Sequence, residues 1–392
     1  MNQLIERFFN YTFYQTPTRR GRRLSHNRAR EQLLAQQLQR DLQALGLREV
    51  TFDSYGAVSA WLPGNEGVSA PVLGFIAPLS ADDHAADTAV HPQLVECYRG
   101  GDIALGQGDA VISPVRVPEL HALIGQTLIT GDGTRAMGCE ATAGITVIMS
   151  LLEQLQTQPH GDVHVAFVPA GERGRDALVA LSQKALRVDY AWCLSGGVPG
   201  ELAWENRHQS TVEIKIAGSA QHSALAAAFA LHQTWLQHGG VATDVLKMRG
   251  DGLHTELTFQ LCEREQVVLD QRLSALAQCC QQQHQHGLQF QFESRYTARN
   301  MAAVNTAHNA VIELARQAID EQQLTLTTPL ARDDSLSIAL VTAGTPCAQL
   351  FSGGYLQRTP QEFVTLEGLQ HSVQVVMGIC RQALGLSQES AA

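Results

Sequence analysis

Two sets of residues carry side chains that could bind a metal ion. Asp82, Asp83 and His84 follow an apolar, strand-like run and combine carboxylate and imidazole groups, which suit zinc and similar cations. A surface loop that turns on its aspartate pair is the alternative interpretation of this segment. Glu140 and Glu172 each lie close to a predicted helix. Their carboxylates together could hold Mg²⁺ or Ca²⁺, although two such ligands without a third make a weak site.

Ser80 and Ser195 are candidate nucleophiles because each lies at the tip of a predicted strand. Neither stands in a G-x-S-x-G turn and neither is accompanied by an identifiable base, so a serine hydrolase finds little support. The glycine-containing loops also lack the phosphate-binding pattern that leads into a helix. These patterns favour neither a serine hydrolase nor a nucleotide site.

The sequence pattern of the first half of the chain predicts the strands and helices that position these residues. Strands at 70–77, 162–169 and 189–195 alternate with helices at 142–156 and 176–186. The strand at 70–77 is an almost continuous apolar run, as expected for a strand that is covered on both faces. The alternation predicts an α/β fold, in which a mostly parallel sheet is flanked by helices. In such sheets, ligands bind beyond the carboxyl ends of the strands.

A second domain interrupts this pattern. Near residue 205 the elements change to the order β-α-β-β-α-β, which predicts a four-stranded antiparallel sheet with two helices on one face. The parallel pattern resumes near residue 300. We therefore predict an α/β domain of residues 1–204 and 301–392, and an inserted α+β lid or dimerisation domain of residues 205–300.

Several motifs place the chain near a known family. "CYRGGDIALG" at 97–106, "LIGQTLIT", "GGY" and "EFVTLEG" are similar to motifs of the peptidase T family of tripeptide aminopeptidases, and the resemblance runs over nearly the whole chain. That family belongs to the clan of co-catalytic zinc amino- and carboxypeptidases. The resemblance implies two zinc ions held by two histidines and three carboxylates, a bridging water and a glutamate as general base.

The family motifs fall on residues that cannot perform most of these roles. Pro78 stands at the first ligand histidine, and Ser80 at the aspartate that orients it. Ser195 stands at a ligand aspartate, and Gln361 at the second histidine. Gly171 stands at the general base, where it has no group to move a proton.

Two carboxylates remain at family positions. Glu140 stands at the bridging carboxylate and Glu172 at the last ligand. If the alignment slips by one residue, Glu172 becomes the base and that ligand is lost, and neither alignment supplies two histidines. The loss of several ligands should abolish tight zinc binding. We therefore predict no cofactor and no catalytic residue.

Two family residues on the substrate side are also present. His222 matches a lid histidine that steadies the developing oxyanion, and the alternative is that it caps the following helix. Arg332 matches an arginine that helps to bind the peptide carboxylate. Because Asp333 and Asp334 follow it, a solvent-facing ion pair is the favoured interpretation.

The predicted function is that of a peptidase-T-like protein without aminopeptidase activity, which binds a peptide-like ligand or has a regulatory role. One alternative is an active metal-dependent hydrolase that releases N-terminal residues from tripeptides through a rebuilt metal site, for which Asp82, Asp83 and His84 are candidates. Another is a structural dimer partner of an active homologue. A homodimer through the lid domain is also expected.

Composition narrows the choice of partner and compartment. The net charge of −10 argues against broad nucleic-acid binding. No apolar run is long enough for a membrane span, and the N-terminus lacks the features of a secretory signal. The eight cysteines include no C-x-x-C pair, which is typical of reduced thiols in the cytoplasm.

Overall fold

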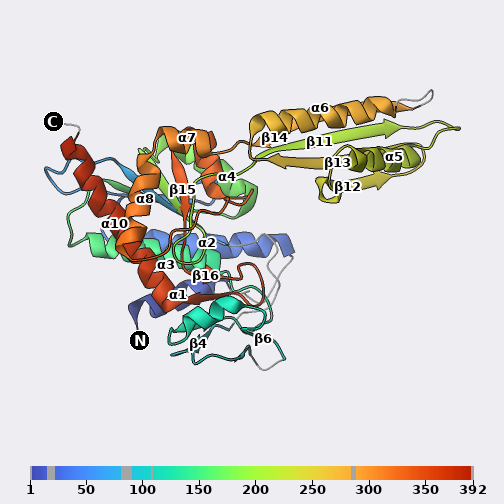
Figure 1. The fold of residues 1–392 in the computed structure, drawn as a ribbon. Coiled ribbons are helices and arrows are strands. Elements are labelled where there is room, and N and C mark those ends of the chain that lie inside the picture. The colour runs from blue at the N-terminus through green and yellow to red at the C-terminus, as the bar shows by residue number, and fades with distance from the viewer. Residues whose placement is uncertain (1, 16–22, 81–90, 107–108, 284–287, 390–392) are drawn as a thin grey trace. The chain divides into compact units, whose positions relative to one another are not determined.

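The computed structural model describes residues 2–15, 23–80, 91–106, 109–283 and 288–389 (Figure 1). The chain divides into two compact units, each with its own hydrophobic core. The larger unit comprises Met1–Trp204 and Ala302–Ala392. The smaller unit comprises Glu205–Met301.

A seven-stranded sheet forms the centre of the larger unit. In spatial order its strands are β1 (Arg48–Phe52), β2 (Val58–Leu62), β8 (Val163–Val168), β3 (Leu73–Pro78), β9 (Tyr190–Leu194), β15 (Cys347–Leu350) and β10 (Leu202–Ala203). The four strands β8, β3, β9 and β15 are parallel, and the other three extend the sheet in antiparallel pairs. Every residue of β3 is buried. The predicted α/β class is confirmed.

Helices cover both faces of this sheet. One face packs against α1 (Gln3–Gln15), α2 (Arg23–Ala44), α3 (Cys139–Leu155), α8 (Ala310–Glu321) and α10 (Leu366–Glu389), and short α7 (Ala302–Ala307) precedes α8. The helices α4 (Gly171–Lys184) and α9 (Leu336–Thr342) contact each other and lie against the other face. At Gly144, α3 comes so close to β9 that a Cβ would lie 2.3 Å from the carbonyl oxygen of Leu194. No helix in the described part of the chain is long and apolar enough to cross a bilayer.

Two helices begin earlier than the sequence predicts. α3 starts at Cys139 instead of 142, and α4 starts at Gly171 instead of near 176. A carboxylate from elsewhere in the chain accepts a backbone N–H at each start: Glu362 accepts that of Cys139 at 3.1 Å, and Glu31 accepts that of Ala170 at 3.0 Å. Because the first N–H groups of a helix lack partners within the helix, these acceptors stabilise the extra turn.

A small sheet gathers segments that are far apart in the sequence. Its strands, in order, are β16 (Gly354–Tyr355), β17 (Phe363–Thr365), β7 (Leu128–Thr130) and β4 (Gln93–Val95). The hairpin of β5 (Ile103–Ala104) and β6 (Val111–Ile112) and the 3-10 helix η1 (Pro118–Leu123) lie in the same part of the chain. The pairing of β17 with β7 brings the loop between β16 and β17 into the neighbourhood of α3.

The smaller unit has the predicted β-α-β-β-α-β order. Its antiparallel sheet runs β12 (Val245–Gly250), β13 (His254–Glu263), β11 (His208–Ala217) and β14 (Gln289–Ala298). α5 (Ala224–Gln237) and α6 (Gln266–Gln282) pack against one face, and the 3-10 helix η2 (Ala242–Asp244) precedes β12. Trp235 and Phe259 lie at the centre of this core, with their rings edge to face. The predicted four-stranded antiparallel sheet is confirmed.

Candidate functional site

The carboxyl ends of β3 and β9 lie at one edge of the large sheet because these strands are parallel neighbours. Pro78 ends β3 and Ser195 follows β9, and both residues are buried. Ser80 lies two residues beyond β3, where its hydroxyl group donates a hydrogen bond to Oε1 of Glu31 at 2.7 Å. None of the side chains of Pro78, Ser80 and Ser195 is an imidazole or a carboxylate.

Glu31, on α2, is a site residue that the sequence analysis missed. Its buried carboxylate accepts hydrogen bonds from Ser80 and from the backbone N–H of Ala170, and it forms an ion pair with Arg173. It therefore ties the tip of β3 to the first turn of α4. Nothing in the sequence distinguishes Glu31 from the surface charges of a polar helix, so its burial could not be foreseen.

The start of α4 holds the position that the family motif assigns to the general base. Gly171 has a φ of +70°, in the left-handed region that favours glycine. Glu172 follows it and is exposed, whereas Glu140 is buried. Within the described residues, no group of three or more histidines, cysteines, aspartates or glutamates could hold a metal ion. Residues 82–84 lie outside the described part.

Glu140 lies in the first turn of α3 and is held by two arginines. Its Oε1 lies 3.0 Å from Nη2 of Arg332, and its Oε2 lies 3.0 Å from Nε of Arg358. Both arginines also contact Asp334, at 3.2 Å from Nε of Arg332 and 2.6 Å from Nη1 of Arg358. We call these four residues the Glu140 cluster. Two guanidinium groups balance two carboxylates in it.

The charges of this cluster stabilise one another. Burial disfavours the ionised form of Asp334, but the adjacent Arg332 and Arg358 outweigh it and hold the pKa of Asp334 below its usual value. Burial likewise disfavours the charged form of Arg358, and the hydrogen bonds and charges of Glu140 and Asp334 reverse this effect and raise the pKa of Arg358. The ion pairs therefore favour the charged forms of Asp334 and Arg358.

Glu362 links the arginine loop to the start of α3. Its buried carboxylate accepts N–H groups of Gly138 and Cys139 through Oε1, and the backbone N–H of Arg358 through Oε2 at 3.0 Å. Burial raises the pKa of Glu362, and these backbone hydrogen bonds oppose the shift. Gln361, the mapped position of the second histidine, precedes it and is half-buried.

Arg358 is the second site residue that the sequence analysis missed. It lies in the loop between β16 and β17 with a φ of +63°, and no motif marks it as a partner for Glu140. The only available signal was its position three residues before Gln361. The structure also revises the expectation for Arg332. It pairs with Asp334 as predicted, but its other partner, Glu140, is only 4% exposed, so the ion pair is not merely solvent-facing.

His222 lies in the smaller unit, just before α5. The N-cap of that helix is Ser223, whose hydroxyl oxygen accepts the N–H of Ala226 at 3.4 Å. The alternative that His222 caps the helix is therefore wrong. The backbone N–H of His222 donates to the hydroxyl group of Ser219, and its buried Nδ1 has no hydrogen-bond partner among the described residues.

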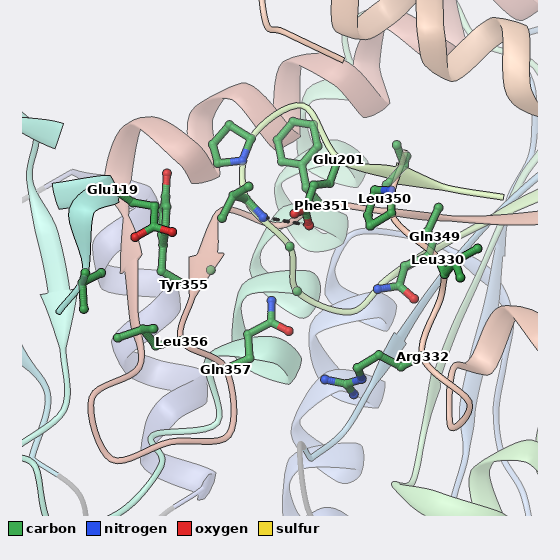
Figure 2. A pocket seen from close by; sticks show the side chains of 18 of the residues that line it. Glu119, Glu201, Leu330, Arg332, Gln349, Leu350, Phe351, Tyr355, Leu356 and Gln357 are labelled. Atoms are coloured by element: carbon green, nitrogen blue, oxygen red, sulfur yellow. Dashed lines mark hydrogen bonds between the residues drawn. The ribbon is translucent and has the colours of Figure 1, made fainter. Parts of the chain in front are cut away.

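A pocket of about 680 Å³ lies next to the Glu140 cluster in the larger unit (Figure 2). Arg332 belongs to both, since it lines the pocket and contacts Glu140. Figure 2 shows Glu119 and Tyr355 together at one side and Arg332 and Gln357 at another. Apolar side chains contribute much of the remaining lining, including Val117, Leu123, Val198, Pro199, Pro329, Leu330, Leu350, Phe351 and Leu356.

The loop after β9 shapes one wall of this pocket. Gly196 has a φ of +88°, and a Cβ there would lie 2.1 Å from Nε2 of Gln357. The amide group of Gln357 therefore packs directly on the glycine. Further along the same loop, Glu201 accepts the backbone N–H of Val198 through Oε2 at 3.2 Å, the dashed line in Figure 2.

Two of the residues that line the pocket, Glu201 and Tyr355, are partly buried. Burial raises the pKa of Glu201, only partly offset by the hydrogen bond from Val198. Burial, followed by the negative charges of Glu119 and Glu201, raises the pKa of Tyr355 to about 12. The ring of Tyr355 is stacked on that of Phe363, with centroids 4.8 Å apart. Tyr355 therefore presents a protonated hydroxyl group at neutral pH.

Comparison with known proteins places the chain in a family. The family model described as Peptidase family M20/M25/M40 matches residues 125–382. The chain is 33% identical to peptidase T of Edwardsiella ictaluri over 407 residues, which cover 98% of each chain. It is 33% identical to peptidase T of Pectobacterium carotovorum over 402 residues, covering 97% of this chain and 98% of the relative.

Solved structures agree on the fold. The aminopeptidase PepT of Bacillus cereus superposes with a TM-score of 0.74 at 16% identity, covering 97% of this chain and 98% of that one. A tripeptidase of Staphylococcus aureus gives the same TM-score and coverage at 15% identity. The architecture of the larger and smaller units is therefore that of known peptidases. By its full-length similarity to peptidase T, the chain belongs to the peptidase family M20/M25/M40.

Proposed function

We propose that this chain keeps the peptidase fold and a ligand pocket but does not hydrolyse peptides through a di-zinc centre. The observation that carries the proposal is the pairing of Glu140 with Arg332 and Arg358. Glu140 is the buried carboxylate at the mapped bridging position, and two guanidinium groups already balance its charge. The adjacent pocket is then free to bind a peptide-like ligand, in keeping with the peptidase T relatives.

A zinc ion at Glu140 would have to compete with fixed positive charges. Arg358 holds both carboxylate oxygens, through Nε at 3.0 Å and Nη2 at 3.3 Å. Such two-point contacts are the stronger kind of ion pair. Arginine stays protonated at any pH at which the protein is folded, so it cannot become a ligand as a histidine can. A divalent cation would therefore have to displace Arg358 or accept its repulsion.

The remaining mapped positions do not fit a di-zinc centre. Pro78, Ser195 and Gln361 offer neither imidazole nor carboxylate, the groups with which such sites hold zinc. Gly171 has no side chain that could take a proton from a water molecule. No hydrolytic step through zinc follows from these residues.

The direct test is zinc content together with peptide hydrolysis. The purified chain is incubated with zinc, dialysed exhaustively and analysed for bound metal, and the same sample is assayed for release of N-terminal residues from tripeptides with and without a chelator. We expect no retained zinc and no release that the chelator abolishes. A peptidase T relative treated in parallel serves as the positive control.

Other results would overturn the proposal in different ways. Two zinc ions per chain with chelator-sensitive release would mean that this protein is an active aminopeptidase. One ion would indicate a rebuilt site, for which residues 82–84 and Glu172 are the first candidates. In that case Glu140→Ala or Glu172→Ala should remove the activity, whereas the proposal expects no activity to remove.

The pairing of two copies through residues 205–300 stays a prediction. Phe229 on α5 is 54% exposed and Leu246 on β12 is 57% exposed, and β12 is an edge strand of its sheet. Unpaired edges and exposed apolar side chains are common at protein contacts. The mass of the chain in solution would decide between one copy and two.

A further inference from the structure

Glu201 contributes a carboxylate to the wall of the pocket. Its Oε2 accepts a hydrogen bond from the backbone N–H of Val198, and in the described part of the chain no arginine, lysine or histidine forms an ion pair with it. Glu140, at the neighbouring cluster, has two arginine partners. The fold therefore leaves one acidic group of the pocket for something else to neutralise.

The surroundings of Glu201 make an ionised carboxylate without an ion-pair partner energetically unfavourable. The residue is partly buried, and burial raises its pKa, which means that the ionised form is poorly solvated. The buried ring of Phe351 and the side chain of Leu350 line the same cavity. At the rim, Leu330 and Leu356 are 41% and 36% exposed. A ligand with a cationic group and an apolar body would satisfy both features.

The side of the pocket that Arg332 lines does not favour an anionic ligand. Arg332 lines it, but Glu140 and Asp334 already balance the charge of that arginine. The amide group of Gln357 lies beside it and forms no hydrogen bond with another residue that the structure describes. This side therefore offers neutral hydrogen-bonding groups, which suit a carbonyl or amide group of a ligand better than a carboxylate.

We propose that the pocket binds a ligand with a primary ammonium group, which Glu201 anchors, and with an apolar group that lies against Phe351 and Leu350. The carboxylate of Glu119, which lies beside Tyr355 in Figure 2, also lines the pocket, and its negative charge favours a cation further. This inference rests on the proposed function only in taking the pocket as the ligand site. It does not depend on whether the chain holds zinc.

The first test compares three probes of one shape on the unaltered protein. 2-Phenylethylamine is cationic at pH 7, 3-phenylpropionamide is neutral and 3-phenylpropionate is anionic. We expect titration by NMR to show that the amine binds at least tenfold more tightly than the other two, because a charge-assisted hydrogen bond is gained only with the ammonium group. Equal binding of all three, tighter binding of the anion, or no binding of the amine would overturn the proposal.

The second test removes the anchor. Glu201→Gln keeps the shape of the side chain and an acceptor for Val198, and we expect it to weaken binding of 2-phenylethylamine at least tenfold while leaving the amide probe unchanged. Glu313→Gln, on the exposed face of α8 where Glu313 pairs with Arg316, controls for the loss of one negative charge. If E201Q binds the amine as the unaltered protein does, Glu201 is not the anchor. If E201Q does not fold, the three-probe comparison decides alone.

The outcome is separable from that of the zinc test. Chelator-sensitive release of residues from tripeptides would contradict the proposed loss of activity, and the preference for an amine could still hold. Absence of hydrolysis together with failure of the amine to bind would leave the proposed loss of activity intact and would reject only the role of Glu201.

Discussion

The Glu140 cluster and the pocket beside it differ in how the fold balances the charge of an acidic side chain. Glu140 lies among internal partners, since two arginines hold its oxygens and a fourth residue, Asp334, completes the balance. Glu201 has one backbone hydrogen bond and no ionic partner in the part of the chain that is described. A charge that the fold satisfies by itself supports structure, whereas a charge that it leaves unsatisfied is available for a ligand.

Arg332 illustrates the difference between the Glu140 cluster and the pocket, because it belongs to the cluster and also lines the pocket. In a pocket that bound an anion, its guanidinium group would be expected to point its charge at the ligand. Here the contacts with Glu140 and Asp334 use that charge within the protein. Arg332 therefore offers little net charge to a ligand in the pocket.

The largest loss of stability is expected from the removal of Glu362, which accepts hydrogen bonds at the start of α3 and at Arg358. Glu362→Ala removes the partner of three backbone N–H groups, two at the start of α3 and one at Arg358. Each buried donor left without an acceptor costs about 1 kcal/mol or more, so we expect the free energy of unfolding to fall by about 3 kcal/mol in chemical denaturation.

Glu172→Ala is the matched control for that substitution. Glu172 also lies in the first turn of a helix, α4, but its side chain is exposed, and a surface change of this kind stays within about 0.5 kcal/mol. Faster hydrogen exchange at Gly138 and Cys139 should accompany the loss in the Glu362 variant alone. If both variants lose the same stability, Glu362 does not hold the start of α3.

The second effect tests the cluster itself. Glu140→Gln keeps the shape of the side chain but leaves Arg332 and Arg358 with Asp334 as their remaining acidic partner. Breaking a fully buried ion pair costs about 3–5 kcal/mol. The two arginine side chains are 40% and 37% exposed, so they can turn toward water, and we expect a smaller loss of about 2 kcal/mol. An unchanged unfolding midpoint would show that the arginines contribute nothing net at Glu140.

The fold could be predicted from the sequence because its strands carry strong local signals. β3 reads as a continuous apolar run, and β11 alternates as a strand with one covered face. The positions that the family resemblance assigns to zinc ligands could be located for a related reason, since they stand in short motifs next to such strands. Pro78 and Ser195 are the clearest cases.

The partners of Glu140 could not be predicted, and the reason is physical. Arg358 reaches it from a loop whose conformation depends on a left-handed backbone at that residue and on a hydrogen bond to Glu362. Neither feature leaves a periodic pattern. Glu31 presents the same difficulty, because a helix of mostly polar residues does not reveal which carboxylate is turned inward.

The smallest expected effect is a gain in stability, and it tests whether Glu201 differs from Glu140. Glu201→Gln is the same chemical change, but the charge that it removes has no ionic partner among the described residues and is disfavoured by burial. We therefore expect a gain of about 0.5–1 kcal/mol in the free energy of unfolding at pH 7, at the low end of the cost of a poorly compensated polar group.

The pH dependence of that gain follows from the raised pKa of Glu201. An acid whose pKa is higher in the folded state than in the unfolded state contributes stability that is present below its unfolded pKa and is lost as the pH rises through its folded pKa. The unaltered protein should therefore match the variant below about pH 4 and fall behind it at neutral pH. If E201Q is instead less stable at pH 7, the ionised carboxylate has a partner within the fold, and Glu201 resembles Glu140 after all.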